Sequence, residues 1–122
     1  MAITGVNHIA FRTPDPARLK AFYRELFAAE ELSGAHDPLR VGHTLLVFFP
    51  SDENPISADP DEVAFDADME GFHDVLERAR ELGAVVREPV DHTRWSKGFV
   101  VRDPDGRQIE VSYDDRGVYW QE

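Results

Sequence analysis

The chain contains two matched segments, one in each half of the sequence. Residues 8–11 read His-Ile-Ala-Phe, residues 62–65 read Glu-Val-Ala-Phe, and each run precedes a segment with apolar residues at helical spacing. Such internal similarity indicates a fold built from two similar halves. His8 and Glu62 then hold equivalent positions, and a two-fold axis relating the halves would bring equivalent residues together. A histidine and a carboxylate placed in this way form a candidate site.

Length and composition limit the possible classes of protein. We expect the 122 residues to form a single domain. The chain has no cysteine, which excludes disulfides, thiolate zinc sites and cysteine nucleophiles and suits a cytoplasmic protein. The first residues have neither a basic region nor a long apolar run, so we expect no signal peptide, and no segment is long enough to span a membrane.

The charge of the chain is strongly acidic. There are 24 Asp and Glu residues against 13 Lys and Arg residues, which gives a net charge of −11. A field of this sign repels phosphate backbones and anionic lipids, so we expect no nucleic-acid or membrane partner. A neutral or cationic small molecule is compatible with it, and the charge also keeps the surface soluble.

Each half reads as a strand, a helix and three further strands. In the first module, about residues 1–52, the pattern predicts a helix from Pro16 to about Phe27 after strand 6–12, and strands at 29–32, 39–41 and 44–49. Residues 51–60 are the predicted linker. In the second module, about 61–115, we expect strand 62–66, helix 69–82, strand 84–87, a loop through Pro89 and Asp91, and strands 98–102 and 108–113. A tail follows at 116–122. The fold class is α+β, with two βαβββ modules and mixed sheets curved around a cleft.

The alternation along the strands places three polar residues on faces turned away from the helices. Ile9 and Phe11, Val63 and Phe65, and Ile109 and Val111 face the helices, which turns His8, Glu62 and Glu110 to the open faces. One imidazole and two carboxylates suit a divalent Mn, Fe, Co, Ni or Zn ion better than Ca or Mg. Three protein ligands would leave positions for water and substrate.

The first-half counterpart of Glu110 follows from a comparison of residues 42–49 with 106–113. This comparison assigns Leu46 to the position of Glu110, so that Leu46 and Phe48 would form an apolar wall of the cleft. Such a wall suits a substrate with an apolar part beside a metal-seeking oxygen.

The chain resembles the vicinal oxygen chelate superfamily over nearly its whole length, and two segments carry the most specific part of this resemblance. These are Val6-Asn7-His8-Ile9-Ala10-Phe11 and Asp103-Pro104-Asp105-Gly106-Arg107-Gln108-Ile109-Glu110-Val111. The superfamily includes glyoxalase I, methylmalonyl-CoA epimerase, extradiol dioxygenases, fosfomycin-resistance transferases and bleomycin-resistance proteins. The resemblance implies metal ligands at His8, Glu62 and Glu110, a small-molecule ligand that chelates the ion through adjacent oxygens, and a homodimer.

One position departs from the pattern of this superfamily. Members with three ligands usually have histidine where this chain has Glu62. Two readings follow: a His-Glu-Glu set that binds a divalent ion, or a metal-free cleft that binds a cationic ligand, as in bleomycin sequestration. The general base and the reaction type are not indicated.

The remaining candidates are weaker. Trp95 and Trp120 either cap the cleft as substrate contacts or bury surface at a subunit interface. His43 is a reserve ligand. His36, His73 and His92 are interpreted as solvated side chains, His92 because it falls in a predicted polar loop.

Overall fold

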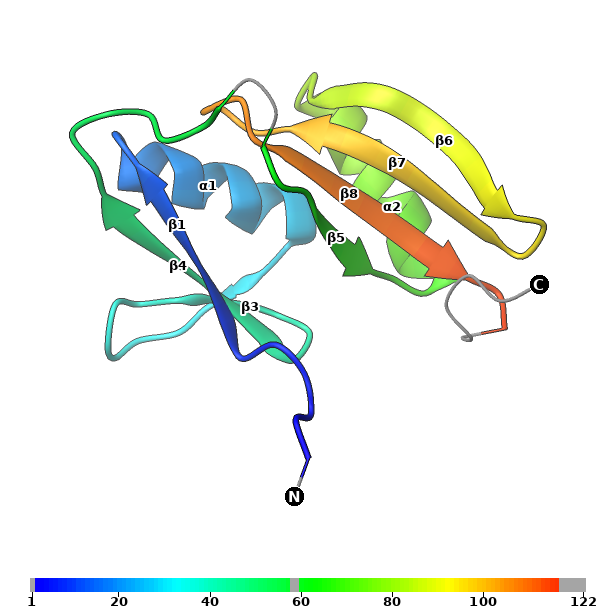
Figure 1. The fold of residues 1–122 in the computed structure, drawn as a ribbon, viewed down its shortest axis with the longest axis horizontal. Helices are drawn as coiled ribbons and strands as arrows, with labels where there is room; N and C mark the ends of the chain where they lie inside the picture. The colour runs from blue at the N-terminus through cyan, green and yellow to red at the C-terminus, as the bar shows by residue number, and fades with distance from the viewer. Residues whose placement is uncertain (1, 58–59, 117–122) are drawn as a thin grey trace. The chain divides into compact units, whose positions relative to one another are not determined.

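The structure is a computed structural model that describes residues 2–57 and 60–116 (Figure 1). The chain divides into two compact units, Met1–Pro55 and Ile56–Glu122. The division falls within the stretch expected to be the linker. No helix in the described ranges is long and apolar enough to cross a membrane.

The first unit is a four-stranded mixed sheet covered by one helix. Its strands are ordered β1-β4-β3-β2, with β1 parallel to β4 and the other pairs antiparallel. The elements are β1 (His8–Thr13), α1 (Pro16–Phe27), β2 (Glu30–Glu31), β3 (Leu39–Val41) and β4 (Thr44–Pro50).

The second unit repeats this topology. Its strands are ordered β5-β8-β7-β6, again with the first pair parallel. The elements are β5 (Val63–Asp66), α2 (Met69–Glu81), β6 (Val85–Thr93), β7 (Ser96–Arg102) and β8 (Gln108–Asp114). Two βαβββ modules with two mixed sheets confirm the predicted α+β fold class.

Both helices begin at the residues expected from the sequence, Pro16 and Met69. The Asp15 carboxylate caps α1 by accepting from the backbone N–H of Arg18, and Pro16 occupies the first turn. In α2 the Asp68 carboxylate accepts from the N–H of Gly71 at 2.7 Å. Gly83 follows α2 with a φ of +66°, the left-handed conformation that favours glycine after a helix.

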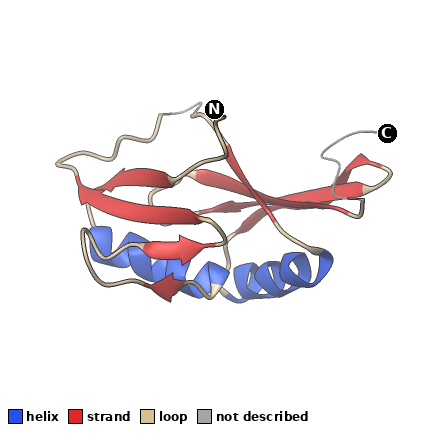
Figure 2. Cartoon of the chain, turned by 90° about the horizontal axis from the view of Figure 1, so that it is seen from below, coloured by secondary structure: helices blue, strands red, loops and turns tan. Residues whose placement is uncertain are grey.

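Each helix covers one face of the sheet of its own unit (Figure 2), and an aromatic residue of the helix packs against that sheet. In the first unit Tyr23 of α1 stacks on Phe11 of β1, with ring centroids 5.1 Å apart. In the second unit Phe72 of α2 meets Phe99 and Tyr113 edge-on at 5.0 and 4.8 Å. These contacts identify the helix-covered face of each sheet, and the opposite faces carry the candidate site residues.

The predicted loop through Pro89 and Asp91 is wrong, because this segment belongs to the nine-residue strand β6. Proline is tolerated there since β6 is an edge strand, and Pro89 falls in an irregular stretch of the ladder between Arg87 and Val90. The irregular pairing disrupts the simple alternation of apolar and polar residues from which a strand is predicted.

Candidate functional site

Glu110 is a buried carboxylate in the middle of β8. Only 4% of the residue is exposed, although it points away from α2, the opposite direction to its neighbours Ile109 and Val111. A carboxylate removed from water requires polar partners. Nε2 of His92 contacts Oε1 of Glu110 within hydrogen-bonding distance, and Nη2 of Arg87 lies 3.5 Å from the same oxygen.

Glu62 supplies a second carboxyl group to the same place. It lies one residue before β5, close enough to Glu110 for the two carboxyl groups to interact. Hydrogen-bond interaction with Glu110, followed by partial burial and by the charge of Glu110, raises the pKa of Glu62 above its ordinary value, while Arg87 and His92 act in the opposite direction. The two carboxyl groups predicted as ligands are therefore neighbours within the second unit.

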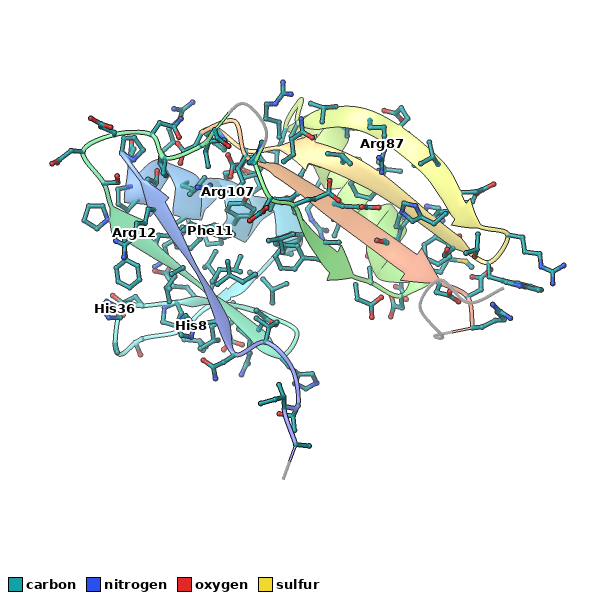
Figure 3. All side chains as sticks on the ribbon, viewed as in Figure 1. His8, Phe11, Arg12, His36, Arg87 and Arg107 are labelled. Carbon is teal, nitrogen blue, oxygen red and sulfur yellow. The ribbon has the colours of Figure 1, made fainter. Side chains whose placement is uncertain are left out.

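The irregularities of β6 bring Arg87 and His92 to the same carboxylate. Because Arg87 is at an odd position and His92 at an even one, their side chains would point to opposite faces of a regular strand. However, Arg87 pairs with Val100 and Asp91 pairs with Lys97, so β6 contains one more residue than β7 between these pairs. A further extra residue, His92, lies between the pairs formed by Asp91 and Thr93. Bulges of this kind redirect side chains, and Figure 3 shows Arg87 on β6.

Gly98 of β7 leaves the space in which His92 and Glu110 meet. A Cβ atom at this position would lie 2.5 Å from Nε2 of His92 and 3.1 Å from Cδ of Glu110, and closer still to Oε1 of Glu110. No side chain fits there without displacing one of the two polar groups. Neither His92 nor Gly98 was selected from the sequence, because the signal that could have found them is the register of β6.

His8 occupies the equivalent position of the first unit. It is exposed at the start of β1, on the face opposite Phe11. Nδ1 of His8 lies 2.8 Å from Oδ1 of Asn7. An N–H donated from Nδ1 leaves a lone pair on Nε2, which is the form in which histidine binds metal ions. Figure 3 labels His8 and Arg12 along β1.

The predicted orientation of Leu46 and Phe48 toward the open face is wrong. Leu46 is 0% exposed, and Phe48 packs against Phe11 and Tyr23 on the side of α1. The comparison of the two halves was shifted by one residue. In the observed registers Ile9 pairs with Leu46 and Val63 pairs with Ile109, so the counterpart of Glu110 is Val47. A shift of one residue reverses every face of a strand.

Trp95 lies in the turn between β6 and β7. Its ring is contacted by the guanidinium groups of Arg94 and Arg116 at 5.1 and 4.8 Å from the ring. Its indole N–H is buried and has no hydrogen-bond partner within residues 2–57 and 60–116. A substrate-binding role for Trp95 stays a prediction, and Trp120 lies outside the described residues.

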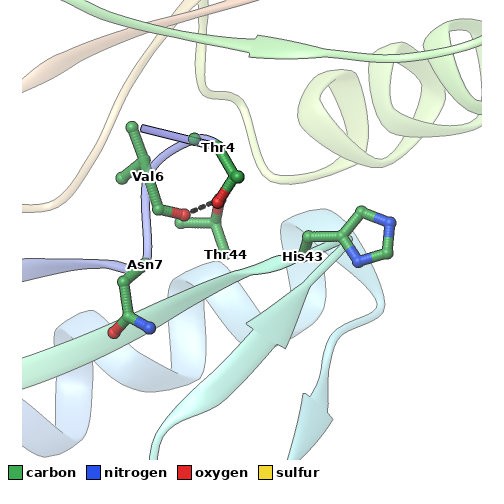
Figure 4. A pocket seen from close by; sticks show the side chains of 6 residues that line it. Thr4, Val6, Asn7, His43 and Thr44 are labelled. Carbon is green, nitrogen blue, oxygen red and sulfur yellow. Dashed lines mark hydrogen bonds between the residues drawn. The ribbon is translucent and has the colours of Figure 1, made fainter. Parts of the chain in front are cut away.

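His43 and His36 lie elsewhere in the first unit. His43 is exposed in the turn before β4, beside an open hollow of about 380 Å³ that is also lined by Thr4, Asn7 and Thr44 (Figure 4). The Thr44 hydroxyl donates to the carbonyl of Val6, another residue that lines this hollow, at 3.3 Å. His36 lies edge-on to Phe49 at 4.8 Å.

The acidic and histidine side chains decide whether the chain can hold a metal ion. In the described part of the chain, no group of three or more His, Asp or Glu side chains is arranged to hold an ion. The donor types nevertheless fit a divalent ion, and Glu62 and Glu110 are in contact. Two of the three predicted donors thus meet within one unit.

Several solved structures share this fold. The fosfomycin resistance protein FosX from Mesorhizobium loti has a TM-score of 0.74 at 22% identity, with 92% of this chain and 93% of that chain covered. A glyoxalase/dioxygenase from Nostoc punctiforme has a TM-score of 0.72 at 23% identity, with 90% of each chain covered. Lactoylglutathione lyase from Agrobacterium tumefaciens has a TM-score of 0.70 at 22% identity, with 92% and 95% covered.

These structural similarities support the fold, and a match of the sequence to a family model shows the family. Residues 8–112 match the family described as Glyoxalase-like domain. This range contains both modules and every candidate donor of the site. The chain therefore belongs to the glyoxalase-like family of the vicinal oxygen chelate superfamily.

Proposed function

We propose that this protein is a divalent-metal-dependent enzyme that acts on a small molecule with two adjacent oxygens. Glu62 and Glu110 supply carboxylate donors, and His8 supplies the nitrogen donor. The observation that supports the proposal is the contact between the carboxyl groups of Glu62 and Glu110. Two adjacent carboxylates repel each other when both are ionised, and a divalent ion relieves that repulsion.

The residues of the chain prepare this site in two ways. The burial of Glu110 limits its access to water, and its contacts with His92 and Arg87 restrict its orientation. On β4, Leu45 pairs with His8 and Phe49 pairs with Arg12, so both share the open face of the first sheet. Leu45 and Phe49 therefore replace Leu46 and Phe48 as the proposed apolar surface for a substrate. A bound ion would polarise the substrate oxygens and stabilise negative charge that develops on them.

A second candidate function is metal-free binding of a small cationic ligand. The observation that favours it is that His92 and Arg87 already contact Glu110, and hydrogen-bonding and charged partners of this kind reduce the need for an ion. In this case Glu62, at the edge of the cluster, would attract the cation. The net charge of −11 favours such a ligand.

Direct metal binding distinguishes the two functions. Protein purified without chelator is analysed for bound metals and titrated calorimetrically with Mn²⁺, Ni²⁺ and Zn²⁺. We expect one site in the wild type and strong weakening in H8A and E110Q. E77Q, which changes an exposed glutamate on α2, is the matched control and should bind as the wild type does.

A bidentate probe tests the role of adjacent oxygens. Acetohydroxamate, which presents two neighbouring oxygens, should bind to the metal-loaded protein and not to the metal-free protein. The metal proposal would be contradicted if the wild type binds no metal, or if H8A and E110Q bind metal as tightly as the wild type does. A rise in melting temperature with a cationic aromatic ligand in the metal-free protein would then support the second candidate.

A further inference from the structure

We propose that His92 is a positioning residue for Glu110: its imidazole holds the carboxylate in the orientation that the site requires, and Gly98 provides the space for the contact. The consequence for metal affinity rests on the proposed function. The contact itself is a property of the second unit and is testable without metal.

Of the two basic side chains that contact Glu110, His92 is the more enclosed. Its side chain is 19% exposed, whereas that of Arg87 is 44% exposed, and the Arg87 contact is the longer at 3.5 Å. A short imidazole loses less conformational freedom than a long, half-exposed guanidinium side chain when it is held in one place. His92 is therefore the stronger constraint on the Glu110 carboxylate.

The backbone next to His92 is fixed by the turn that follows it. The N–H of Thr93 donates to the Ser96 hydroxyl at 3.2 Å, and the hydroxyl groups of Thr93 and Ser96 are 3.0 Å apart. The N–H of Trp95 donates to the Thr93 hydroxyl at 3.0 Å. Because Ser96 is buried, this network holds the bulge that directs His92 toward β8.

Gly98 of β7 provides the space for the contact between His92 and Glu110. It pairs with Ser112 in the ladder between β7 and β8, diagonally from Glu110, and any Cβ atom there would occupy the volume of the contact. Three features of separate strands thus serve one contact: a bulge in β6, a glycine in β7 and a buried carboxylate in β8. This convergence supports a positioning role rather than an incidental surface contact.

The expected effect on metal binding follows from known partners of ligating carboxylates. Loss of such a hydrogen-bond partner typically weakens metal affinity by about 10- to 100-fold. We expect this loss in H92L, which has no donor. In H92Q the amide nitrogen reaches about the position of Nε2, so H92Q should restore much of the affinity. The exposed His73 of α2 provides the control H73Q, which should not change affinity.

The experiment combines Mn²⁺ calorimetry with nitrogen NMR of the histidine rings in metal-free protein. In the NMR measurement, E110Q should shift the Nε2 signal of His92 and leave that of His73 unchanged. Wild-type affinity in H92L would overturn the positioning role while the metal site stands. If the wild type binds no metal, the proposed function fails, and the NMR measurement decides: a shift supports the positioning role, and no shift overturns it. The same measurement decides if H92L does not fold.

Discussion

The carboxyl group of Glu62, at the start of the second module, interacts with the carboxyl group of Glu110 in the last strand of the sheet, and this interaction raises the pKa of Glu62. The parallel pairing of β5 with β8 produces this contact, because Ala64 pairs with Glu110 and Glu62 enters on the same face. The contact links the two carboxylates most relevant to function, and it also makes stability depend on pH.

The first prediction concerns the pH dependence of stability. The pKa of Glu62 is higher in the folded protein than its ordinary value of 4.5, so the folded state retains a proton that the unfolded state loses. The contribution of Glu62 to stability is therefore fully present below pH 4.5 and declines as the pH rises through the raised folded pKa. In E62Q this decline should disappear.

Urea denaturation between pH 4 and pH 8 checks this prediction. The free energy of unfolding of E62Q, relative to the wild type, should increase with pH. E77Q serves as the exposed control, with a difference that does not change over the same range. Parallel pH profiles of E62Q and the wild type would contradict the role of the Glu62–Glu110 contact.

The second prediction concerns the space above Gly98. G98A places a methyl group against His92 and Glu110, and overpacking of this kind costs about 1–3 kcal/mol of stability. H92A should relieve part of the crowding, so the effects of G98A and H92A should not add. A double-mutant cycle measured by chemical denaturation tests this coupling. Additive effects would mean that the two positions do not share one space.

The third prediction tests the register of β4. L46A removes a fully buried side chain on the side of α1 and should cost about 2–5 kcal/mol. L45A alters the partly exposed opposite face and should cost clearly less. Equal losses of stability in L46A and L45A, measured by denaturant titration, would contradict the observed register of β4.

The fourth prediction concerns the turn before β8. The Asp103 carboxylate accepts from Nη1 of Arg107 at 2.7 Å and from the backbone N–H groups of Asp105 and Arg107. Because Asp103 and Arg107 are buried, D103A leaves buried groups without this partner and should cost about 3–5 kcal/mol. In the exposed pair of Asp91 with Lys97, D91A should cost at most about 1 kcal/mol. Similar melting temperatures for the two variants would contradict the structural role of Asp103.

The strand β6 illustrates why part of the candidate site could not be predicted. Alternation correctly placed His8 and Glu110 opposite the helix-facing residues, because β1 and β8 have regular ladders. In β6 the extra residues disturb the alternation, and Pro89 suggests a loop. His92 was therefore interpreted as solvated, although it contacts the buried Glu110.

The sequence alone determined the two-module plan, the positions of both helices, and which residues of β1 and β8 face away from the helices. These features follow from local periodicity, capping residues and internal similarity, all of which are properties of short segments. Tertiary structure decided which face of β4 is buried, and it brought His92, Arg87 and Glu62 to Glu110. Those outcomes depend on strand register and on bulges, and register is set by pairing between segments distant in the chain.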